Sequence, residues 1–375
     1  MMRVDAATRW VVLDTRLVRH TGIGTYIRTL FSRLPRLADG LEYLAISNPG
    51  LPRVGTFPVL TVRSRPLDLT TQFLPFELRG VNAALLHVPY ITAPLLWPGR
   101  LVITIHDLIP LILPETIPSR VRRGAFHLWA SMAAQKATVI VTDSECSRRD
   151  IVRLLGVPPR KVVVIPPAIG EEFIPADRNR AGDAHRLLSG ERYFLSVGRH
   201  KPHKNLSRLI RAFHRVRQEQ RAALVIAGPE PPPADLRDEV QRLGLEHTVQ
   251  FAGHVDDADL PGYYQAAVAV VIPSLYEGFG LPALEGMACG TPVVASNRAA
   301  LPEVVGDAAL LIDPEDEHGL AAAMLRLLRD DSLRQELRER GLARAQTFSA
   351  QTSAARLADI YRTLAQEERP NPDGA

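Results

Sequence analysis

Cysteine is scarce in this chain of 375 residues, and the two cysteines present, Cys146 and Cys289, lie far apart in the sequence. A disulfide framework therefore has no support, and a reducing compartment is expected. The chain also lacks any run of about 18 apolar residues, the length that a membrane-spanning helix needs. Its opening stretch, MMRVDAATRWVVLD, has no apolar segment of the kind that signal peptides contain. We therefore expect a cytoplasmic protein.

The chain also shows no strong bias toward apolar or charged residues. Apolar residues make up 46% of the chain and charged residues 23%, which excludes a disordered protein. The formal net charge is only +4, but the pI is about 9.2 and Arg dominates over Lys. The surface is therefore expected to tolerate anionic partners such as phosphate, nucleotides or lipid head groups. Nucleic acid is not expected as a partner, because the basic residues are scattered and no recognition motif occurs.

The length and the pattern together predict two α/β domains. A chain of 375 residues is too long for one hydrophobic core of ordinary size. Short β-branched runs alternate with helical patterns up to about residue 166, and a second series starts with YFLSVG at residue 193. This alternation predicts two doubly wound domains, each a parallel sheet covered by helices. Residues 166–192, rich in Pro, Gly and charge, are interpreted as the linker.

In such domains ligands bind beyond the carboxyl ends of the strands, so the segments that follow strands are the candidate sites. The first, RHTGIGTYIRTL, places Gly22 and Gly24 before a helix, whose free N–H groups suit a phosphate or a sugar oxygen. Ile27 occupies the place of the third glycine in the dinucleotide fingerprint, which argues against a dehydrogenase. A flexible turn before a helix explains the two glycines equally well.

The second candidate segment is LVITIHDLIP, in which His106 and Asp107 follow a strand. A histidine at this edge can donate to a substrate hydroxyl or accept from it, and Asp107 can fix its tautomer or hold the following turn. The alternative is a histidine whose ring is satisfied by the backbone at a strand end.

In the third segment, Arg199 follows the strand YFLSV and Lys204 lies at the predicted start of the next helix. The helix dipole disfavours a cation at that end, so an anionic ligand would relieve the conflict. The alternative is ordinary solvated charge. His200 and His203 have H-x-x-H spacing, but no third ligand is evident, so a zinc site is not expected.

The fourth segment, EGFGLPALE, carries the strongest signal. Gly278 and Gly280 allow a phosphate to approach the backbone closely, and Pro282 suits the first turn of a helix that points its amide end at the same place. Glu277 and Glu285 are then expected to accept hydrogen bonds from ligand hydroxyls. The alternative is that Glu277 is a solvated loop carboxylate and Glu285 a helix-start charge favoured by the dipole.

This segment resembles the E-x7-E motif of retaining glycosyltransferases of family 4, which have the GT-B fold of two Rossmann-like domains facing across a cleft. Counterparts of TGIGTYIRTL, HDLIP, VIVTDSECSRRDI, SVGRHKPHKNLSRLIRAF and VQFAGHV occur in that family in the same order, so the resemblance covers nearly the whole chain. GIGTYIRTL and HDLIP are most similar to segments of bacterial mannosyltransferases of surface-polysaccharide assembly.

The resemblance implies a hexosyltransferase that moves a sugar, with retention, from a nucleotide-diphosphate donor to a sugar or lipid-linked acceptor. GDP-mannose is the favoured donor. The alternative is a non-transferring GT-B protein, such as a nucleotide-sugar epimerase or a nucleotide-binding module. The resemblance also implies an N-terminal acceptor-binding domain, residues 1–168, joined by a C-terminal helix at 352–368, and a donor-binding domain, residues 169–351.

The resemblance further assigns roles to individual residues. Arg199 and Lys204 would bind the donor diphosphate, Glu277 the donor sugar, and His106 the transferred sugar or the reacting centre. Glu285 would bind the ribose. The other donor contacts would come from Gly22, Gly24, Gly228, Phe251, Gly253, Phe279, Gly280 and Leu281, with Gly228, Phe251 and Gly253 near the nucleobase.

No cofactor and no metal ion are expected. Arg199 and Lys204 can supply the positive charge that a metal would bring to a diphosphate. The D-x-D pattern in DDAD, residues 256–259, directly precedes a predicted helix, and helix capping explains it.

Residues 119–137 mix four basic residues with Phe126, Trp129 and Met132. This composition suits peripheral contact with an anionic membrane, such as the inner face of the plasma membrane, near a lipid-linked acceptor. The alternative is a helix that packs its aromatic residues into the first domain.

Overall fold

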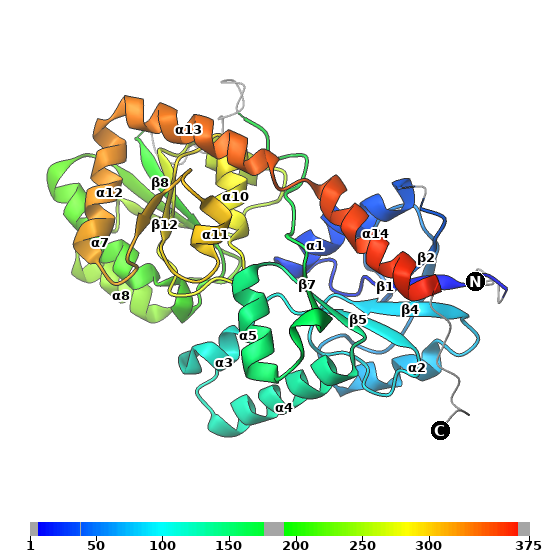
Figure 1. Ribbon diagram of the computed structural model, residues 1–375. Helices are drawn as coiled ribbons and strands as arrows, with labels where there is room; N and C mark the ends of the chain where they lie inside the picture. The colour runs from blue at the N-terminus through cyan, green and yellow to red at the C-terminus, as the bar shows by residue number, and fades with distance from the viewer. Residues whose placement is uncertain (1–6, 38, 176–190, 367–375) are drawn as a thin grey trace. The chain divides into compact units, whose positions relative to one another are not determined.

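The computed structural model describes residues 7–37, 39–175 and 191–366, and the chain divides into two compact units (Figure 1). Unit 1 comprises residues 1–111, 119–168 and 348–375, and unit 2 comprises residues 112–118 and 169–347. Most of the predicted linker, residues 176–190, lies outside the described residues.

Unit 1 is built on a seven-stranded parallel sheet in the order β3-β2-β1-β4-β5-β6-β7. Every residue of the central strands β1 and β4 is buried, as expected for strands that helices cover on both faces. The strands are β1 (Trp10–Asp14), β2 (Glu42–Ser47), β3 (Val59–Thr61), β4 (Ala83–Val88), β5 (Arg100–Thr104), β6 (Val139–Thr142) and β7 (Val162–Val164).

The helices of this part of the chain connect successive strands, and their ends follow from local sequence. Helix α5 begins where the hydroxyl of Ser144 accepts from the backbone N–H of Ser147, and it ends at Gly156 in the left-handed conformation. The helices are α1 (Ile23–Leu30), η1 (Phe31–Arg36), η2 (Leu69–Phe73), α2 (Leu74–Glu77), α3 (Ile109–Ile112), α4 (Arg120–Lys136), α5 (Glu145–Leu155) and η4 (Pro159–Lys161).

The C-terminal helix α14 (Ala350–Gln366) belongs to unit 1, although the preceding helices belong to unit 2. Its residue Tyr361 is fully buried, and the hydroxyl hydrogen-bonds the ring of His87 on β4. Near the start of α14, the hydroxyl of Ser353 donates to the carbonyl of Pro166 at 2.8 Å. These contacts attach the helix to the sheet of unit 1.

Unit 2 contains a six-stranded parallel sheet in the order β10-β9-β8-β11-β12-β13. The edge strand β13 has only three residues. The strands are β8 (Tyr193–Val197), β9 (Ala223–Ala227), β10 (Val249–Gly253), β11 (Ala269–Ile272), β12 (Val293–Ser296) and β13 (Leu310–Ile312).

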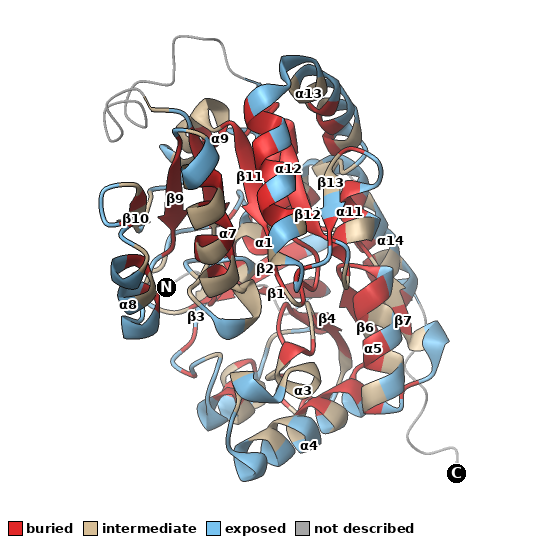
Figure 2. Ribbon diagram, turned by 90° about the vertical axis from the view of Figure 1, so that its left-hand side faces the viewer, coloured by how far each residue is buried: buried red, intermediate tan, exposed pale blue. Residues whose placement is uncertain are grey.

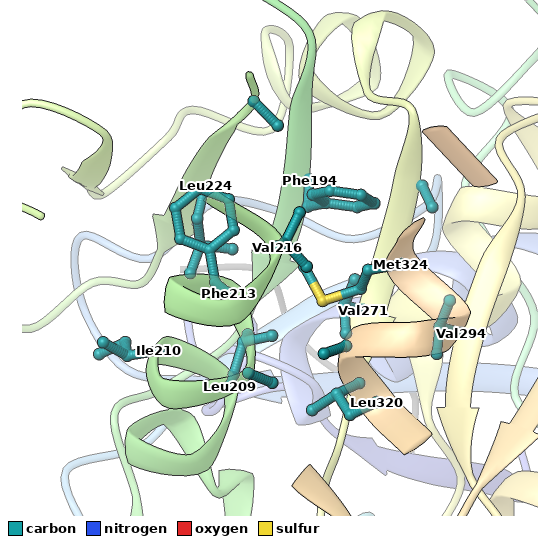
Figure 3. Close-up of a cluster of buried hydrophobic side chains, with 14 of the residues drawn as sticks. Phe194, Leu209, Ile210, Phe213, Val216, Leu224, Val271, Val294, Leu320 and Met324 are labelled. Carbon is teal, nitrogen blue, oxygen red and sulfur yellow. The ribbon is translucent and has the colours of Figure 1, made fainter. Parts of the chain in front are cut away.

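The core of unit 2 lies between this sheet and the helices that cover it. Figure 3 shows Phe213 of α7 and Met324 of α12 among sheet residues such as Phe194 and Val271. The helices are η3 (Pro114–Thr116), η5 (Pro202–Lys204), α7 (Leu206–Glu219), α8 (Ala234–Arg242), α9 (Leu260–Ala266), α10 (Leu281–Ala288), α11 (Leu301–Val305), α12 (Glu317–Arg329) and α13 (Asp331–Gln346).

Helix α4 is formed by the segment for which the sequence analysis left two alternatives, contact with a membrane or packing of its aromatic residues into the first domain. Its fully buried residues are alanines, and in Figure 2 most of its ribbon is pale blue or tan. Phe126 and Trp129 are half-buried, whereas Val121 is 83% and Leu128 62% exposed. Aromatic packing is therefore only partial. No helix within residues 7–37, 39–175 and 191–366 combines the length and apolarity that a membrane crossing requires.

Candidate functional site

The strands of unit 2 are parallel, so the loops that follow them meet at one edge of the sheet. A pocket lies there, at the carboxyl ends of β8, β9 and β11. Its lining consists of Ser196, Val197, Gly198, Arg199, Lys204, Leu206, Ile226, Ile272 and Ser274.

A buried ion pair stands beside this pocket. The Nζ of Lys204, at the end of η5, lies 2.7 Å from the Oε1 of Glu277, and the hydroxyl of Ser274 donates to the same oxygen at 2.6 Å. The side chains of Lys204 and Glu277 are only 18% and 9% exposed, so neither is a solvated surface charge. Burial alone would raise the pKa of Glu277, but the charge and hydrogen bond of Lys204 and the bond from Ser274 hold it below 4.5. Glu277 is therefore an anion at neutral pH.

The backbone fixes the two loops that carry this pair. The backbone N–H of Leu275 donates to the carbonyl of His203 at 2.7 Å. Asn205, with a left-handed φ of 59°, donates from Nδ2 to the carbonyls of Pro273 and Pro314. These bonds explain why the loop after β8 meets the loop after β11 in one defined position.

The helix α10 begins immediately beyond Glu277. Gly280 has a φ of 108°, and a Cβ atom at this position would lie 2.6 Å from the Cδ2 of Leu301. The backbone conformation therefore favours glycine, and a Cβ atom would also displace the end of the Leu301 side chain. Phe279, Gly280 and Leu281 form the entry to the helix, with Pro282 in its first turn, as the sequence predicts.

Glu285 lies one turn into α10 and is only 8% exposed, which rules out a helix-start surface charge. The hydroxyl of Tyr264 on α9 donates to its Oε2 at 2.6 Å. Burial raises the pKa of Glu285 to about 7, because the hydrogen bond from Tyr264 only partly offsets the loss of water. This carboxyl group therefore titrates near neutrality. The sequence analysis missed Tyr264, which no local pattern connects with Glu285.

Arg199 lies in the loop after β8 and lines the same pocket, but its partner is Glu230. The Nη2 of Arg199 is 2.5 Å from the Oε1 of Glu230, and the arginine side chain is 43% exposed. The sequence analysis missed Glu230. Its position in the loop after β9, two residues beyond Gly228, was the available signal.

Gly228, Phe251 and Gly253 come together at the ends of β9 and β10. The backbone N–H of Gly228 donates to the carbonyl of Gly253 at 3.0 Å. A Cβ atom on Gly228 would lie 2.4 Å from the carbonyl oxygen of Gly198, so the close approach of the two loops requires glycine. The ring of Phe251 makes an edge contact with the ring of His200 at 6.0 Å.

The remaining predicted residues lie in unit 1. Gly22, with a φ of 76°, precedes α1, and a Cβ atom on Gly24 would lie 2.5 Å from the carbonyl oxygen of Val18. The ring of Tyr26 on α1 makes an edge contact with the ring of His106 at 5.3 Å. The structure thus brings the helix that follows the glycine loop next to the histidine after β5.

His106 is hydrogen-bonded to a side chain and not to the backbone alone. Its Nδ1 lies 2.7 Å from the Oδ2 of Asp143, which follows β6. Asp107 instead holds the turn, because its Oδ1 accepts from the backbone N–H of Ile109 at 3.0 Å. The sequence analysis weighed Asp107 for the histidine tautomer and missed Asp143, although Asp143 also follows a strand on the same sheet edge.

The DDAD segment is not explained by side-chain capping, so that prediction was wrong. Asp259 precedes α9, but its side chain makes no capping hydrogen bond. The backbone N–H groups of Asp259 and Leu260 bond the carbonyl of Asp256 instead. In the part of the chain that the structure describes, no three His, Cys, Asp or Glu side chains are grouped as metal ligands.

Comparisons with known proteins cover most of the chain. The family described as "Glycosyl transferases group 1" matches residues 177–344, and "Glycosyltransferase Family 4" matches residues 20–173. O-antigen chain mannosyltransferase B of Escherichia coli is 38% identical over 271 residues, which cover 71% of each chain. The serotype-specific mannosyltransferase WbdA of Escherichia coli is 28% identical over 74% of this chain, a match that spans only 35% of WbdA.

Solved structures share the fold across nearly the full length. Sucrose-phosphate synthase from Thermosynechococcus elongatus has a TM-score of 0.79 at 23% identity and covers 95% of this chain and 99% of its own. The glycosyltransferase WaaG of lipopolysaccharide biosynthesis has a TM-score of 0.72 at 16% identity, with 94% and 99% covered. Anabaena HepE in complex with UDP-glucose has a TM-score of 0.76 at 18% identity, with 94% and 99% covered. The chain therefore has the GT-B fold, as predicted, and belongs to the group 1 and family 4 glycosyltransferases, as an enzyme of the hexosyltransferase class.

Proposed function

We propose that this enzyme transfers mannose from GDP-mannose, with retention, to a hydroxyl group of a sugar or lipid-linked sugar acceptor during polysaccharide assembly. The observation that carries the proposal is the buried pair of Lys204 and Glu277 beside the first turn of α10. Such a site offers a cation and backbone N–H groups to a diphosphate and an anion to sugar hydroxyls. The similarity to O-antigen mannosyltransferase B supports mannose, and the HepE complex supports a nucleotide sugar as donor.

In this proposal the cationic side chains of Lys204 and Arg199 stabilise the negative charge that builds up on the leaving diphosphate. An ammonium group has three N–H donors, so Lys204 can keep its bond to Glu277 and still donate to a phosphate oxygen. The guanidinium of Arg199 likewise has N–H donors other than the Nη2 group that pairs with Glu230. These two residues take the place of a metal ion, and no cofactor is needed.

The acids and glycines hold the rest of the donor. Glu277, anionic because Lys204 lowers its pKa, accepts from hydroxyls of the donor sugar, together with the backbone of residues 279–281. Glu285 accepts from the ribose. Gly228, Phe251 and Gly253 lie beside the nucleobase. In unit 1, Gly22 and Gly24 shape the loop that meets the donor, and His106 contacts the transferred sugar.

The direct test is a donor screen with the purified protein in buffer that contains EDTA. We expect GDP-mannose to raise the thermal midpoint most among nucleotide sugars, because a ligand stabilises the state that it binds. We also expect release of GDP to accelerate only when a mannose-containing acceptor is present. Conversion of GDP-mannose without an acceptor would favour an epimerase, and stabilisation without turnover would favour a binding module. Activity that EDTA abolishes and Mg²⁺ or Mn²⁺ restores would overturn the metal-independent site.

We further propose that α4 rests on the surface of an anionic membrane, where a lipid-linked acceptor would be found. Val121, Leu128 and Met132 on this helix are exposed, and Arg120 and Arg122 are exposed with them. Apolar side chains beside cations suit the boundary between lipid head groups and acyl chains. Co-sedimentation with anionic vesicles at low salt is expected, and replacement of Val121 and Leu128 by Ser should reduce it. Equal sedimentation of this variant would contradict the assignment to α4.

A further inference from the structure

The ring of His106 faces a hydrogen-bond acceptor at each of its two nitrogens. Nδ1 lies 2.7 Å from the Oδ2 of Asp143, and Nε2 lies 3.2 Å from the carbonyl oxygen of Pro89. A carboxylate and a carbonyl have no hydrogen to donate, and a neutral imidazole has only one N–H. Only the imidazolium form satisfies both contacts.

The turn that carries Asp143 is built around the His106 segment. The hydroxyl of Thr142 donates to the carbonyl of Ile105 at 2.7 Å, and the hydroxyl of Ser147 donates to the carbonyl of His106 at 2.9 Å. The backbone on both sides of the histidine is therefore tied to the end of β6 and the start of α5. Asp143, only 6% exposed, holds the ring from the same turn.

The charges around the ring favour the cation. Burial lowers the pKa of His106, but the charge and hydrogen bond of Asp143, the charge of Asp107 and the bond to Pro89 together raise it above 6.5. His87 on β4 is fully buried, and burial with the nearby His106 lowers its pKa to about 3, so it stays neutral. From α1, Tyr26 presents only a neutral phenol to the His106 ring at physiological pH, because burial raises the pKa of Tyr26.

We propose that Asp143 is a positioning residue that holds His106 as a doubly donating imidazolium, so that His106 offers the substrate a positive charge and an N–H group and does not act as a base. The side chain of His106 is 20% exposed, and its longer contact is the one from Nε2. The Nε2–H group is therefore the donor from which both the carbonyl oxygen of Pro89 and a substrate oxygen can accept a hydrogen bond. This use of His106 rests on the proposed function, whereas the state of its ring does not.

The ring state is tested on the protein without ligand. In histidine-labelled protein, with the signal assigned through His106→Gln, we expect the His106 resonance to titrate above pH 6.5, the ordinary histidine value. In Asp143→Asn the midpoint should fall by one pH unit or more, a tenfold or larger loss of proton affinity. Asp143→Glu should recover part of the shift. Ser147→Ala, which removes a bond to the backbone but not to the ring, should leave the midpoint unchanged. A wild-type midpoint at or below 6.5, or equal midpoints in wild type and Asp143→Asn, would overturn the proposal.

The role of the positive charge of His106 in the reaction is tested by the pH dependence of donor turnover. In the wild type, kcat/KM for GDP-mannose should fall on the alkaline side as the pH rises through the titration midpoint of His106, because the imidazolium is then lost, whereas protonation of Glu285 sets the separate fall on the acidic side. In Asp143→Asn the fall should move to lower pH by the same amount as the resonance. If the resonance moves and the fall in kcat/KM does not, the cationic role in the reaction is refuted. If no donor is turned over by the wild type, the proposed function fails while the titration result stands.

Discussion

Replacing Lys204 with alanine is expected to lower kcat about 100-fold to 1000-fold, with a smaller change in KM for the donor. The loss of one fixed donor that stabilises developing charge typically has this size. Lys204 is suited to that role because the loops after β8 and β11 hold it in place, and Glu277 and Ser274 complete its surroundings. Steady-state kinetics with GDP-mannose and an acceptor would measure the change. Near wild-type turnover would refute the assignment.

The loss of Lys204 also leaves Glu277 buried without its cation, and this destabilises the fold. Removing one partner of a buried ion pair typically costs about 3–5 kcal/mol. The double variant Lys204→Ala/Glu277→Ala separates the two effects, because it removes both charges. We expect its thermal midpoint to recover relative to Lys204→Ala, while its kcat stays low. Recovery of both would mean that the pair serves only the fold.

Lys201 provides the matched control for this experiment. It lies in the same loop, three positions before Lys204, but it is exposed, and Glu277 is paired with Lys204. Lys201→Ala should change kcat less than twofold. A loss as large as that of Lys204→Ala would mean that the general positive charge of the loop matters and not the position of Lys204.

The sequence predicts the part of this site that local patterns encode. Alternating strands and helices place the loops at one sheet edge, and the E-x7-E segment marks Glu277 and Glu285. Pro282 and Gly280 also mark the start of α10, because each residue suits one position at a helix end. These patterns involve residues that are close together in the sequence, so they can be recognised without knowledge of the three-dimensional contacts.

The partners of these residues are what the sequence analysis missed. Glu277 and Lys204 are 73 positions apart, and His106 and Asp143 are 37 apart. Each pair forms because two parallel strands end at the same edge, and no period or spacing specifies which polar residue after one strand meets which residue after another. The pKa shift of Glu285 depends on burial, on the hydrogen bond from Tyr264, 21 positions away, and on the charges of distant residues such as Glu172. Its direction is therefore accessible only from the folded structure.

Replacing Glu285 with glutamine is expected to remove a pH dependence of stability between pH 4.5 and about 7. The folded protein raises the pKa of Glu285 from 4.5 to about 7, so in this range it binds more protons than the unfolded chain. The stability that this group contributes is fully present below pH 4.5, declines as the pH rises, and is lost above about 7. The linked change in unfolding free energy is about 3 kcal/mol.

The measurement is the thermal midpoint of the wild type minus that of Glu285→Gln across this range. The difference should fall as the pH rises to about 7 and then stay constant, and parallel curves would contradict the shifted pKa. Tyr264→Phe serves as a control, because it should raise the pKa of Glu285 further and so enlarge the pH dependence that Glu285→Gln removes. The bond that Tyr264 donates lowers the pKa of Glu285, so its removal should extend the decline to higher pH.

The same titration should appear in donor binding if Glu285 accepts from the ribose hydroxyls. A carboxylate accepts with both oxygens, whereas the protonated acid gives one of them a hydrogen. The KM for the donor should therefore fall as the pH rises through about 7 in the wild type, and Glu285→Gln should lose this step and bind the donor more weakly. A donor KM that keeps the step in Glu285→Gln would assign the titration to another group and would remove Glu285 from the ribose site.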